Sequence, residues 1–247
     1  MGNLPTMQWA RDLLRTVFAL AVAVPATGYY AAKVWFLAAR SPNDPRVESL
    51  VRRWASVCLK AAGVRLEVEG ADLVDPSRSY VVVSNHLSGM DIMAHFAALP
   101  VPIRFLAKTE LFRIPVFGRA MRSIGIVEVD RGAGRSIHEH INTTAKAAVD
   151  RGLSLIIYPE GTRPRDGVMR PFKKGAFTIA TSMQLPVVPT AIRGSRRVWR
   201  PGSLMIKSGT IEVTVMAPIE TVGLGPPDVD GLRKRVNTMV IGAVNTG

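Results

Sequence analysis

His86 and Asp91 stand five residues apart in the segment Ser84-Asn85-His86-Leu87-Ser88-Gly89-Met90-Asp91, and their side chains are suited to acid–base chemistry. Histidine takes up and releases a proton near neutral pH more readily than other side chains. A neighbouring carboxylate can fix the tautomer of the imidazole ring and stabilise the imidazolium that forms. The pair therefore has the residue types of a general base and the acid that orients it.

The flanking residues place this pair at a turn between a strand and a helix. The apolar run Tyr80–Val83 is typical of a buried strand, and residues 91–99 are typical of a helix. Side chains at such a turn can converge on the cleft outside a strand end, where α/β proteins bind ligands. We therefore predict catalytic roles for His86 and Asp91.

Two other interpretations of the same residues remain open. Ser88 and Asp91 have nearly the spacing and composition of a capping box, in which Asp91 would only accept a backbone N–H group. His86, Asp91 and His95 are a third, weaker possibility as metal ligands, because the segment lacks the cysteines or further histidines of a strong zinc signature. We expect no metal.

Size and charge limit the class of protein. A chain of 247 residues can form one substantial α/β domain with a small appendage. Its formal charge of +13 indicates anionic partners. We expect no nucleic acid, because zinc-finger cysteines, a basic zipper and aromatic RNA-binding motifs are absent and the mean hydropathy is +0.17. The single cysteine, Cys58, excludes an intrachain disulfide.

The N-terminal region is expected to bind a membrane. Thr16–Ala32 is a run of 17 uncharged residues that contains Pro25 and Gly28, and it is shorter than the roughly 20 residues of a spanning helix. Basic residues flank it on both sides, so no crossing direction is indicated. We expect an interrupted helical segment that enters one leaflet; a single span is the alternative. We assign residues 1–63 to this membrane-associated segment and 64–247 to the α/β domain.

Beyond Gly63 the chain alternates between strand and helix patterns. Strands are predicted at Arg65–Glu69, Tyr80–Ser84, Ile103–Ala107, Gly125–Val129, Leu153–Tyr158 and Val187–Ile192. Helices are predicted near 91–99, 113–123, 134–151, 174–183 and 227–243, after an earlier helix that Asp44 caps. Leu204–Ile206 and Thr210–Val215 are expected to form a hairpin. The order predicts an α/β fold with a mixed, largely parallel sheet flanked by helices.

Two loops combine acidic and basic residues directly after predicted strands. Glu160, Gly161, Thr162 and Arg163 follow one strand, and Asp130-Arg131 follows another. The planar guanidinium of arginine suits bidentate binding of phosphate. For either loop alone, a solvated turn with local ion pairs is the simpler interpretation.

Together these segments carry a family resemblance. Asn85-His86-x4-Asp91, Gly125…Asp130-Arg131, Tyr158-Pro159-Glu160-Gly161-Thr162-Arg163 and Leu185-Pro186-Val187-Val188-Pro189 occur in that order. Over roughly residues 65–220 the chain resembles the glycerolipid acyltransferase family, whose bacterial membrane-associated members are 1-acylglycerol-3-phosphate acyltransferases. It departs from the family pattern at Tyr158, Glu128 and Thr190. Glu128 would bring a negative charge near a site for an acidic substrate.

The resemblance implies a reaction and a set of site residues. An acyl group would pass from an acyl thioester to the free hydroxyl of 1-acylglycerol 3-phosphate, which makes phosphatidic acid for phospholipid synthesis. His86 would be the general base and Asp91 its orienter. The glycerol phosphate would be contacted by Glu160, Gly161, Thr162 and Arg163, with help from Lys108, Asp130 and Arg131.

The same resemblance implies the partners, and the length, interruption and charge of the N-terminal segment predict the location. The co-substrate would be acyl-CoA or acyl carrier protein thioester, and no cofactor is expected. The protein would work with a lysophospholipid on the cytoplasmic face of the cell membrane. One alternative is an acyltransferase of this fold for another acceptor, such as lyso-ornithine lipid or glycerol 3-phosphate. The other is a non-catalytic phospholipid-binding membrane protein, for which His86 would be dispensable.

Overall fold

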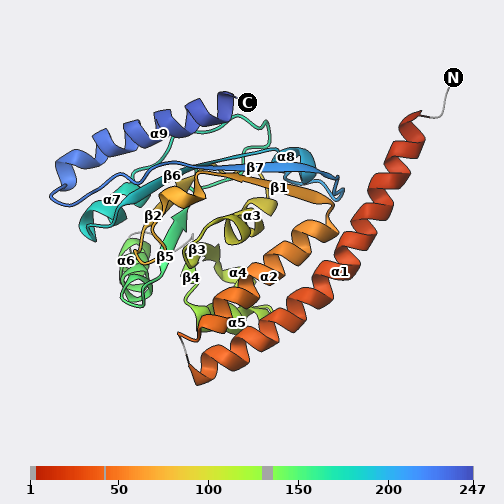
Figure 1. Cartoon of the computed structure of the whole chain (residues 1–247), viewed down its shortest axis with the longest axis horizontal. Helices are drawn as coiled ribbons and strands as arrows, with labels where there is room; N and C mark the ends of the chain where they lie inside the picture. Colours follow the sequence, from red (N-terminus) through yellow and green to blue (C-terminus); the bar gives the residue numbers. More distant parts are fainter. Residues whose placement is uncertain (1–3, 42, 130–135, 247) are drawn as a thin grey trace.

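The computed structural model describes residues 4–41, 43–129 and 136–246, and a seven-stranded mixed sheet lies at its centre (Figure 1). The strand order is β1-β7-β6-β2-β5-β3-β4. The strands are β1 (Val64–Glu69), β2 (Val81–Ser84), β3 (Ile103–Lys108), β4 (Val127–Val129), β5 (Ser154–Ile157), β6 (Val187–Arg193) and β7 (Gly209–Val215). The expected mixed sheet is confirmed.

The pairing of the strands brings five carboxyl ends to one edge of the sheet. β2 pairs in parallel with β5 and β6, and β3 pairs in parallel with β5 and β4. β7 runs antiparallel to β6, while β1 runs parallel to β7. The carboxyl ends of β2 to β6 therefore share an edge, which is where such sheets bind ligands.

Helices cover both faces of the sheet. They are α1 (Leu4–Arg40), α2 (Pro45–Ala61), α3 (Met90–Ala98), α4 (Thr109–Phe112), α5 (Phe117–Ile124), α6 (Ser136–Val149), α7 (Gly175–Ser182), α8 (Ser195–Val198) and α9 (Val229–Asn245), with 3-10 turns η1 (Ala71–Leu73) and η2 (Pro226–Asp228). One core cluster contains Val82 with residues of α1, α2, α3 and α5. The other contains Val81 and Val83 with residues of α6, α7 and α9. β2 is thus buried on both faces, as its continuous apolar run predicts.

The N-terminal region forms two helices that pack together. Asp44 caps α2 by accepting the N–H of Arg46 at 2.9 Å, as expected. α1 differs from expectation, because Pro25 and Gly28 lie inside one helix of 37 residues and do not interrupt it. Figure 1 shows that α1 bends along its length, which is the usual effect of a proline inside a helix. Buried residues on both sides of Pro25, Ala19 and Ala31, hold the helix in the core cluster shared with α2 and α5.

Two further predictions are wrong, each for an identifiable reason. The helix expected at 113–123 begins only at Phe117, as α5, and α4 ends before it at Phe112, because Pro115 lacks an N–H group and disfavours helical backbone at the preceding residue. The hairpin is absent, since 204–206 is not a strand and β7 pairs with β1 and β6 instead. The hydroxyl of Thr16 in α1 accepts the N–H of Ile206 at 2.8 Å. The backbone at Ile206 therefore bonds to α1 and not to a second strand of a hairpin.

Candidate active site

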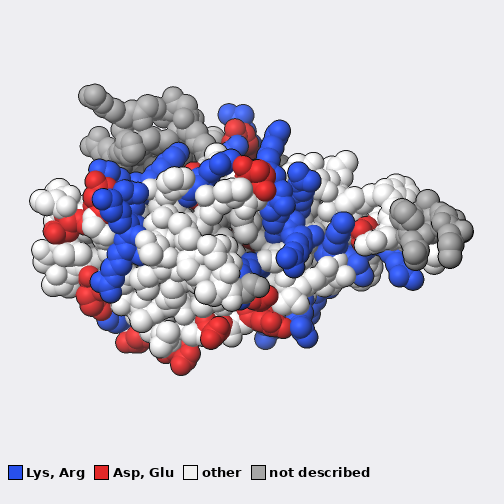
Figure 2. Space-filling view, turned by 90° about the horizontal axis from the view of Figure 1, so that it is seen from above, with Lys and Arg blue, Asp and Glu red and all other residues white. Residues whose placement is uncertain are grey.

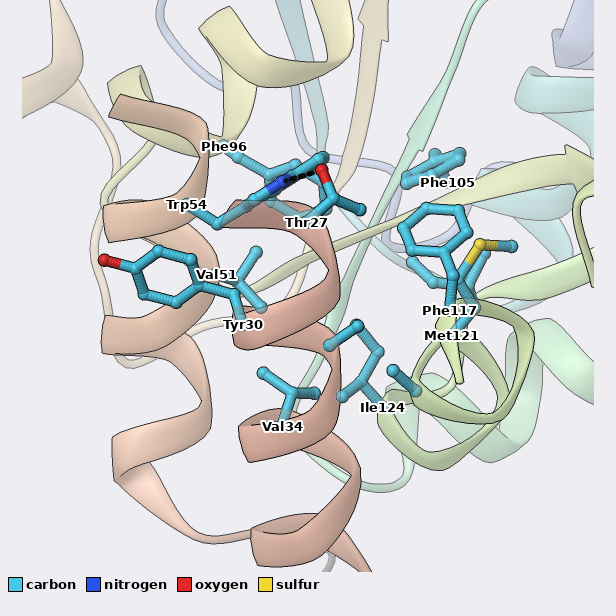
Figure 3. Close-up of a pocket in the computed structure, with 13 residues that line it drawn as sticks. Thr27, Tyr30, Val34, Val51, Trp54, Phe96, Phe105, Phe117, Met121 and Ile124 are labelled. Atoms are coloured by element: carbon cyan, nitrogen blue, oxygen red, sulfur yellow. Dashed lines mark hydrogen bonds between the residues drawn. The ribbon is translucent and has the colours of Figure 1, made fainter. Parts of the chain in front are cut away.

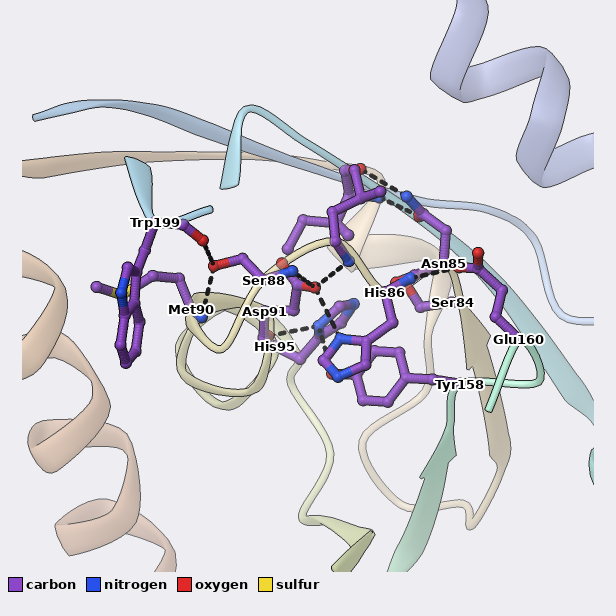
Figure 4. A network of polar contacts seen from close by, with 12 residues as sticks. Ser84, Asn85, His86, Ser88, Met90, Asp91, His95, Tyr158, Glu160 and Trp199 are labelled. Atoms are coloured by element: carbon purple, nitrogen blue, oxygen red, sulfur yellow. Dashed lines mark hydrogen bonds and ion pairs between the residues drawn. The ribbon is translucent and has the colours of Figure 1, made fainter. Parts of the chain in front are cut away.

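His86 and Asp91 lie in the turn between β2 and α3, and their side chains touch (Figure 4). Nδ1 of His86 is 2.8 Å from Oδ2 of Asp91. The same oxygen accepts the backbone N–H groups of Leu87 at 2.7 Å and Ser88 at 2.8 Å. Asp91 therefore holds the imidazole and also accepts backbone N–H groups at the start of α3. The geometry expected for a base with its orienter and the geometry expected for a capping box are present together.

The burial of the two side chains suits a base and its orienter. Asp91 is fully buried, and the side chain of His86 is 16% exposed. Because Nδ1 donates its proton to Asp91, Nε2 is the ring nitrogen that can accept one. No hydrogen-bond partner of Nε2 is found in the described part of the chain. The imidazole can therefore take a proton from a ligand in the cleft, while the carboxylate stabilises the resulting charge.

Tyr158 and His95 complete the surroundings of the imidazole, and the sequence did not indicate this role for either. The ring of Tyr158 stacks on His86 with centroids 4.1 Å apart and planes 18° apart. Nδ1 of His95 donates to the backbone oxygen of Asp91 at 2.7 Å and lies 3.2 Å from the Tyr158 hydroxyl. Burial lowers the pKa of His95 to about 4 and raises the pKa of Tyr158 well above its ordinary value. Both side chains are therefore neutral at neutral pH.

Glu160 joins the loop after β5 to the turn that carries His86. Its side chain is buried, and its two oxygens accept the backbone N–H groups of His86 at 2.7 Å and Arg170 at 2.8 Å. Burial raises the pKa of this carboxyl group above its ordinary value. A buried carboxylate held by two backbone donors is arranged to position the turn that carries His86.

Asn85 fixes the same turn from the other side. Its side-chain amide donates to the backbone oxygen of Ile192 at 2.9 Å and accepts the N–H of Ile192 at 2.8 Å. Asn85 is fully buried and follows the last residue of β2. The amide thus extends the pairing of β2 with β6 by one residue, directly before His86.

The structure brings part of the predicted phosphate-binding set together. A Cβ atom on Gly89 would meet Nη1 of Arg163 at 3.5 Å, so this guanidinium lies against the catalytic turn. Gly161 has a φ of +76°, a backbone conformation that favours glycine. A Cβ atom there would lie 3.0 Å from Nζ of Lys173, so the lack of a side chain at Gly161 leaves room for the Lys173 ammonium group.

The other predicted contacts are placed less closely. Thr162 is exposed beside Arg163, and Lys108 is exposed at the carboxyl end of β3 on the same sheet edge. Asp130 and Arg131 lie outside the described residues. Glu128, whose charge raised a question about an acidic ligand, pairs with Arg122 at 3.1 Å, so its charge is balanced by a cation.

An apolar pocket lies where α1, α2, α3 and α5 meet (Figure 3). It is lined by Thr27, Tyr30, Ala31, Val34, Val51, Trp54, Phe96, Phe105, Phe117, Ala120, Met121, Ile124 and Ile126. The indole N–H of Trp54 donates to the hydroxyl of Thr27 at 3.0 Å, which satisfies two of the few polar groups in the wall. The lining is almost entirely apolar, and Phe96 lies on the same helix as Asp91.

Among the side chains that the structure describes, no three from His, Cys, Asp or Glu are grouped so that they could hold an ion. Nδ1 of His95, the third residue of the possible metal set, is directed to the backbone oxygen of Asp91.

Comparison with known proteins agrees with the geometry. Residues 65–193 match the family model described as Acyltransferase. The chain is 35% identical over 174 residues to 1-acyl-sn-glycerol-3-phosphate acyltransferase alpha of Homo sapiens, covering 70% of this chain and 62% of the human protein. It is 35% identical over 159 residues to 1-acyl-sn-glycerol-3-phosphate acyltransferase of Cocos nucifera, covering 64% of this chain and 51% of that protein. The chain thus spans between half and two thirds of the length of these curated relatives.

A solved structure is similar over nearly its full length. The crystal structure of the 1-acyl-sn-glycerophosphate (LPA) acyltransferase PlsC from Thermotoga maritima superposes with a TM-score of 0.81 at 26% identity. The match covers 94% of this chain and 93% of that chain. Together with the family model, which spans more than half of the residues, these findings show that the chain belongs to the acyltransferase family.

Proposed function

We propose that this protein transfers a fatty acyl group from an acyl thioester to the free hydroxyl of 1-acylglycerol 3-phosphate, which forms phosphatidic acid. The observation that carries the proposal is the 2.8 Å contact between Nδ1 of His86 and the buried carboxylate of Asp91. It leaves Nε2 to act as a base at the carboxyl edge of the sheet. The names of the similar proteins from Homo sapiens, Cocos nucifera and Thermotoga maritima support the choice of acceptor.

The reaction needs a base but no nucleophile from the protein. Nε2 of His86 removes the proton as the acceptor hydroxyl attacks the thioester carbonyl carbon. The new C–O bond forms, the C–S bond breaks, and the proton passes from His86 to the departing sulfur. Asp91 stabilises the imidazolium between these two steps. No cofactor is required, because acyl-CoA or acyl carrier protein supplies the activated acyl group.

The substrate contacts follow from the charges around the turn. Arg163 lies against Gly89 and is suited to grip the acceptor phosphate, with Gly161 leaving room for Lys173 nearby. Thr162, Lys108, Asp130 and Arg131 remain proposed contacts on the strength of the family resemblance. For Glu160 we propose a positioning role in place of a phosphate contact, because backbone N–H groups occupy both of its oxygens.

The acyl chains belong on the apolar side of the molecule. The pocket between α1, α2, α3 and α5 offers a wall of aliphatic and aromatic side chains for one chain. Burial of such a chain contributes about 0.8 kcal/mol per methylene group. A lysophospholipid can therefore keep its own acyl chain in the membrane while the donor chain enters the protein.

The long N-terminal helix supports attachment to a membrane. Among the described helices only Met7–Arg40 is long and apolar enough to cross one, by length and composition. Its outward side exposes Met7, Trp9, Leu13, Leu14, Val17, Phe18, Leu20, Val24, Tyr29, Trp35 and Phe36. We propose that this side lies in one leaflet.

Packing of α1 against the domain favours this arrangement over a full span. Thr16 bonds to Ile206, and Val34 is buried in the shared core cluster. These residues are about 27 Å apart along the helix, close to the roughly 30 Å thickness of a hydrocarbon core. A spanning α1 would draw the attached polar domain into the bilayer. The buried free thiol of Cys58 fits the cytoplasmic face, which is reducing.

A panel of acceptors tests the proposal. Purified protein with acyl-CoA or acyl carrier protein thioester should acylate 1-acylglycerol 3-phosphate faster than lyso-ornithine lipid or glycerol 3-phosphate. A preference for either of the latter would keep the chemistry and overturn the acceptor. Absence of transfer to every acceptor, with vesicle binding retained, would favour a non-catalytic phospholipid-binding protein.

A further inference from the structure

The connection between α8 and β7 carries the most exposed large hydrophobic side chain in the described part of the chain. Leu204 is 89% exposed, compared with 71% for Leu14, the most exposed of these side chains on α1. A single exposed leucine needs no explanation on its own. Leu204, however, lies in a connection that is held rigidly and placed beside the apolar helix.

Local hydrogen bonds hold the tip of this connection. Pro201 and Gly202, with a φ of +81°, occupy the two central positions of a turn closed by the N–H of Ser203 and the backbone oxygen of Arg200 at 3.0 Å. Proline followed by a glycine of positive φ is typical of a type II turn. The indole N–H of Trp199 also donates to the backbone oxygen of Ser203 at 2.9 Å. Leu204 is therefore presented by a preformed turn.

The connection is joined to the membrane helix at one end. The hydroxyl of Thr16 accepts the N–H of Ile206 at 2.8 Å, and Lys207 lies 3.8 Å from Asp12. Figure 1 shows the connection reaching from the sheet toward α1. Leu204 is thus two residues from Ile206, which bonds directly to α1 at Thr16, and Leu13 and Val17 are exposed on the same helix.

At its other end the connection touches the catalytic turn. The hydroxyl of Ser88 donates to the backbone oxygen of Trp199 at 2.8 Å. A Cβ atom on Gly89 would lie 3.1 Å from Cζ3 of the Trp199 ring, so the indole packs directly on the turn. One short segment therefore links α1 to the residues between His86 and Asp91.

Positive charge surrounds the exposed leucine. Arg197 is exposed in α8, directly before the connection, and Arg200 and Lys207 are exposed within it. Figure 2 shows Lys and Arg side chains gathered between the body of the molecule and the projecting end of α1. Basic side chains around an apolar tip match a leaflet that contains anionic lipids, to which each cation adds attraction near the surface.

We propose that the connection Trp199–Lys207 is a second lipid-binding element, whose Leu204 enters the same leaflet as α1. Its contact with the turn at Ser88 and Gly89 then fixes the position of His86 relative to the lipid headgroups. This inference rests on the proposed membrane attachment of α1. It adds a contact at the carboxyl edge of the sheet, where the acceptor must arrive.

Labelling of an introduced cysteine tests the proposal in the full-length chain. Leu204→Cys, Leu14→Cys and Val222→Cys are each labelled with an environment-sensitive fluorophore and mixed with vesicles of phosphatidylcholine and phosphatidylglycerol. Cys58 is buried, and burial raises its pKa to about 11, so labelling of the unmodified chain gives a low background. Val222 is 75% exposed beside Gln184 and Leu185, before the amino end of β6, at the sheet edge opposite Leu204.

Positions 204 and 14 should show a blue-shifted emission that lipid-borne quenchers reduce, and position 222 should show neither. Response at 14 without response at 204 overturns the inference and leaves the membrane attachment standing. Absence of response at both overturns the attachment as well. Response at 204 to an acidic carrier protein but not to vesicles would assign the segment to a protein partner and overturn the lipid contact.

A matched pair of substitutions measures the contribution. Leu204→Ser should weaken vesicle binding roughly tenfold, because burial of one leucine side chain changes a partition constant by about that factor or more. Val222→Ser should leave binding unchanged. Equal binding of both variants would contradict the proposal.

Discussion

Replacing Glu160 by glutamine distinguishes a carboxylate that positions the catalytic turn from one that binds substrate. The two oxygens of Glu160 accept the N–H groups of His86 at 2.7 Å and Arg170 at 2.8 Å. Glutamine keeps the shape but presents an amide NH₂ group to one of these donors. Both bonds lose the negative charge of their acceptor, and one backbone N–H is left unpaired.

The expected magnitude follows from that loss. A hydrogen bond to a charged group contributes about 1.5–3 kcal/mol. If displacement of the His86 backbone raises the activation free energy by this amount, kcat falls roughly 10- to 100-fold. KM for the lysophospholipid should stay within about a factor of two, because no substrate contact is removed.

Steady-state acylation with vesicle-bound lysophosphatidic acid measures both constants. Glu220→Gln is the matched control, since Glu220 is exposed and pairs with Arg78 at 3.0 Å on the surface. That control should keep kcat and KM. A rise in KM for Glu160→Gln with kcat unchanged would refute the positioning role and support direct contact with the acceptor.

Three further predictions concern the surroundings of the imidazole. Arg163→Ala should raise KM for the lysophospholipid about 10- to 100-fold, with poor rescue by lysine; an equal loss with uncharged monoacylglycerol would contradict phosphate binding. Tyr158→Leu should lower kcat roughly 2- to 12-fold at constant KM, because it removes the ring that stacks on His86. Tyr158→Phe keeps that ring and should retain activity. Equal activity of the two variants would exclude a role for the stack. The pKa of His95 is about 4 in the folded protein, against an ordinary value of 6.5. As the pH falls, the unfolded chain therefore binds a proton at His95 before the folded protein does. The free energy of unfolding should fall by on the order of 3 kcal/mol between pH 6.5 and pH 4. Urea unfolding at several pH values should show that this loss is absent in His95→Gln, and an unchanged pH dependence would contradict it.

Local patterns were enough to predict most of the fold. The apolar run before His86 and the helical pattern after Asp91 correctly placed the turn between β2 and α3. The start of α2 followed from Asp44 and Pro45, because capping depends on neighbouring residues. The late start of α5 at Phe117 was also predictable, since Pro115 stands in the expected helix.

Contacts between distant segments were beyond such patterns. The stack of Tyr158 on His86 requires β5 to lie beside β2, although β3 and β4 come between them in the chain. Asn85 bonds to Ile192, 107 residues away. The expected hairpin failed because Thr16, 190 residues away, takes the backbone of Ile206. Spacing along the chain therefore predicted that His86 and Asp91 would meet, but it did not predict how Tyr158, Asn85 and Glu160 hold their turn.

The kcat of His86→Ala, measured beside its thermal unfolding, tests the central claim most directly. Loss of a general base should lower kcat by about 10²–10⁴-fold while the fold is retained and KM for the lysophospholipid changes little. Asp91→Asn should approach the same loss, because the carboxylate fixes the tautomer of His86 at 2.8 Å. A folded His86→Ala protein with near-normal kcat would contradict acid–base catalysis at this turn.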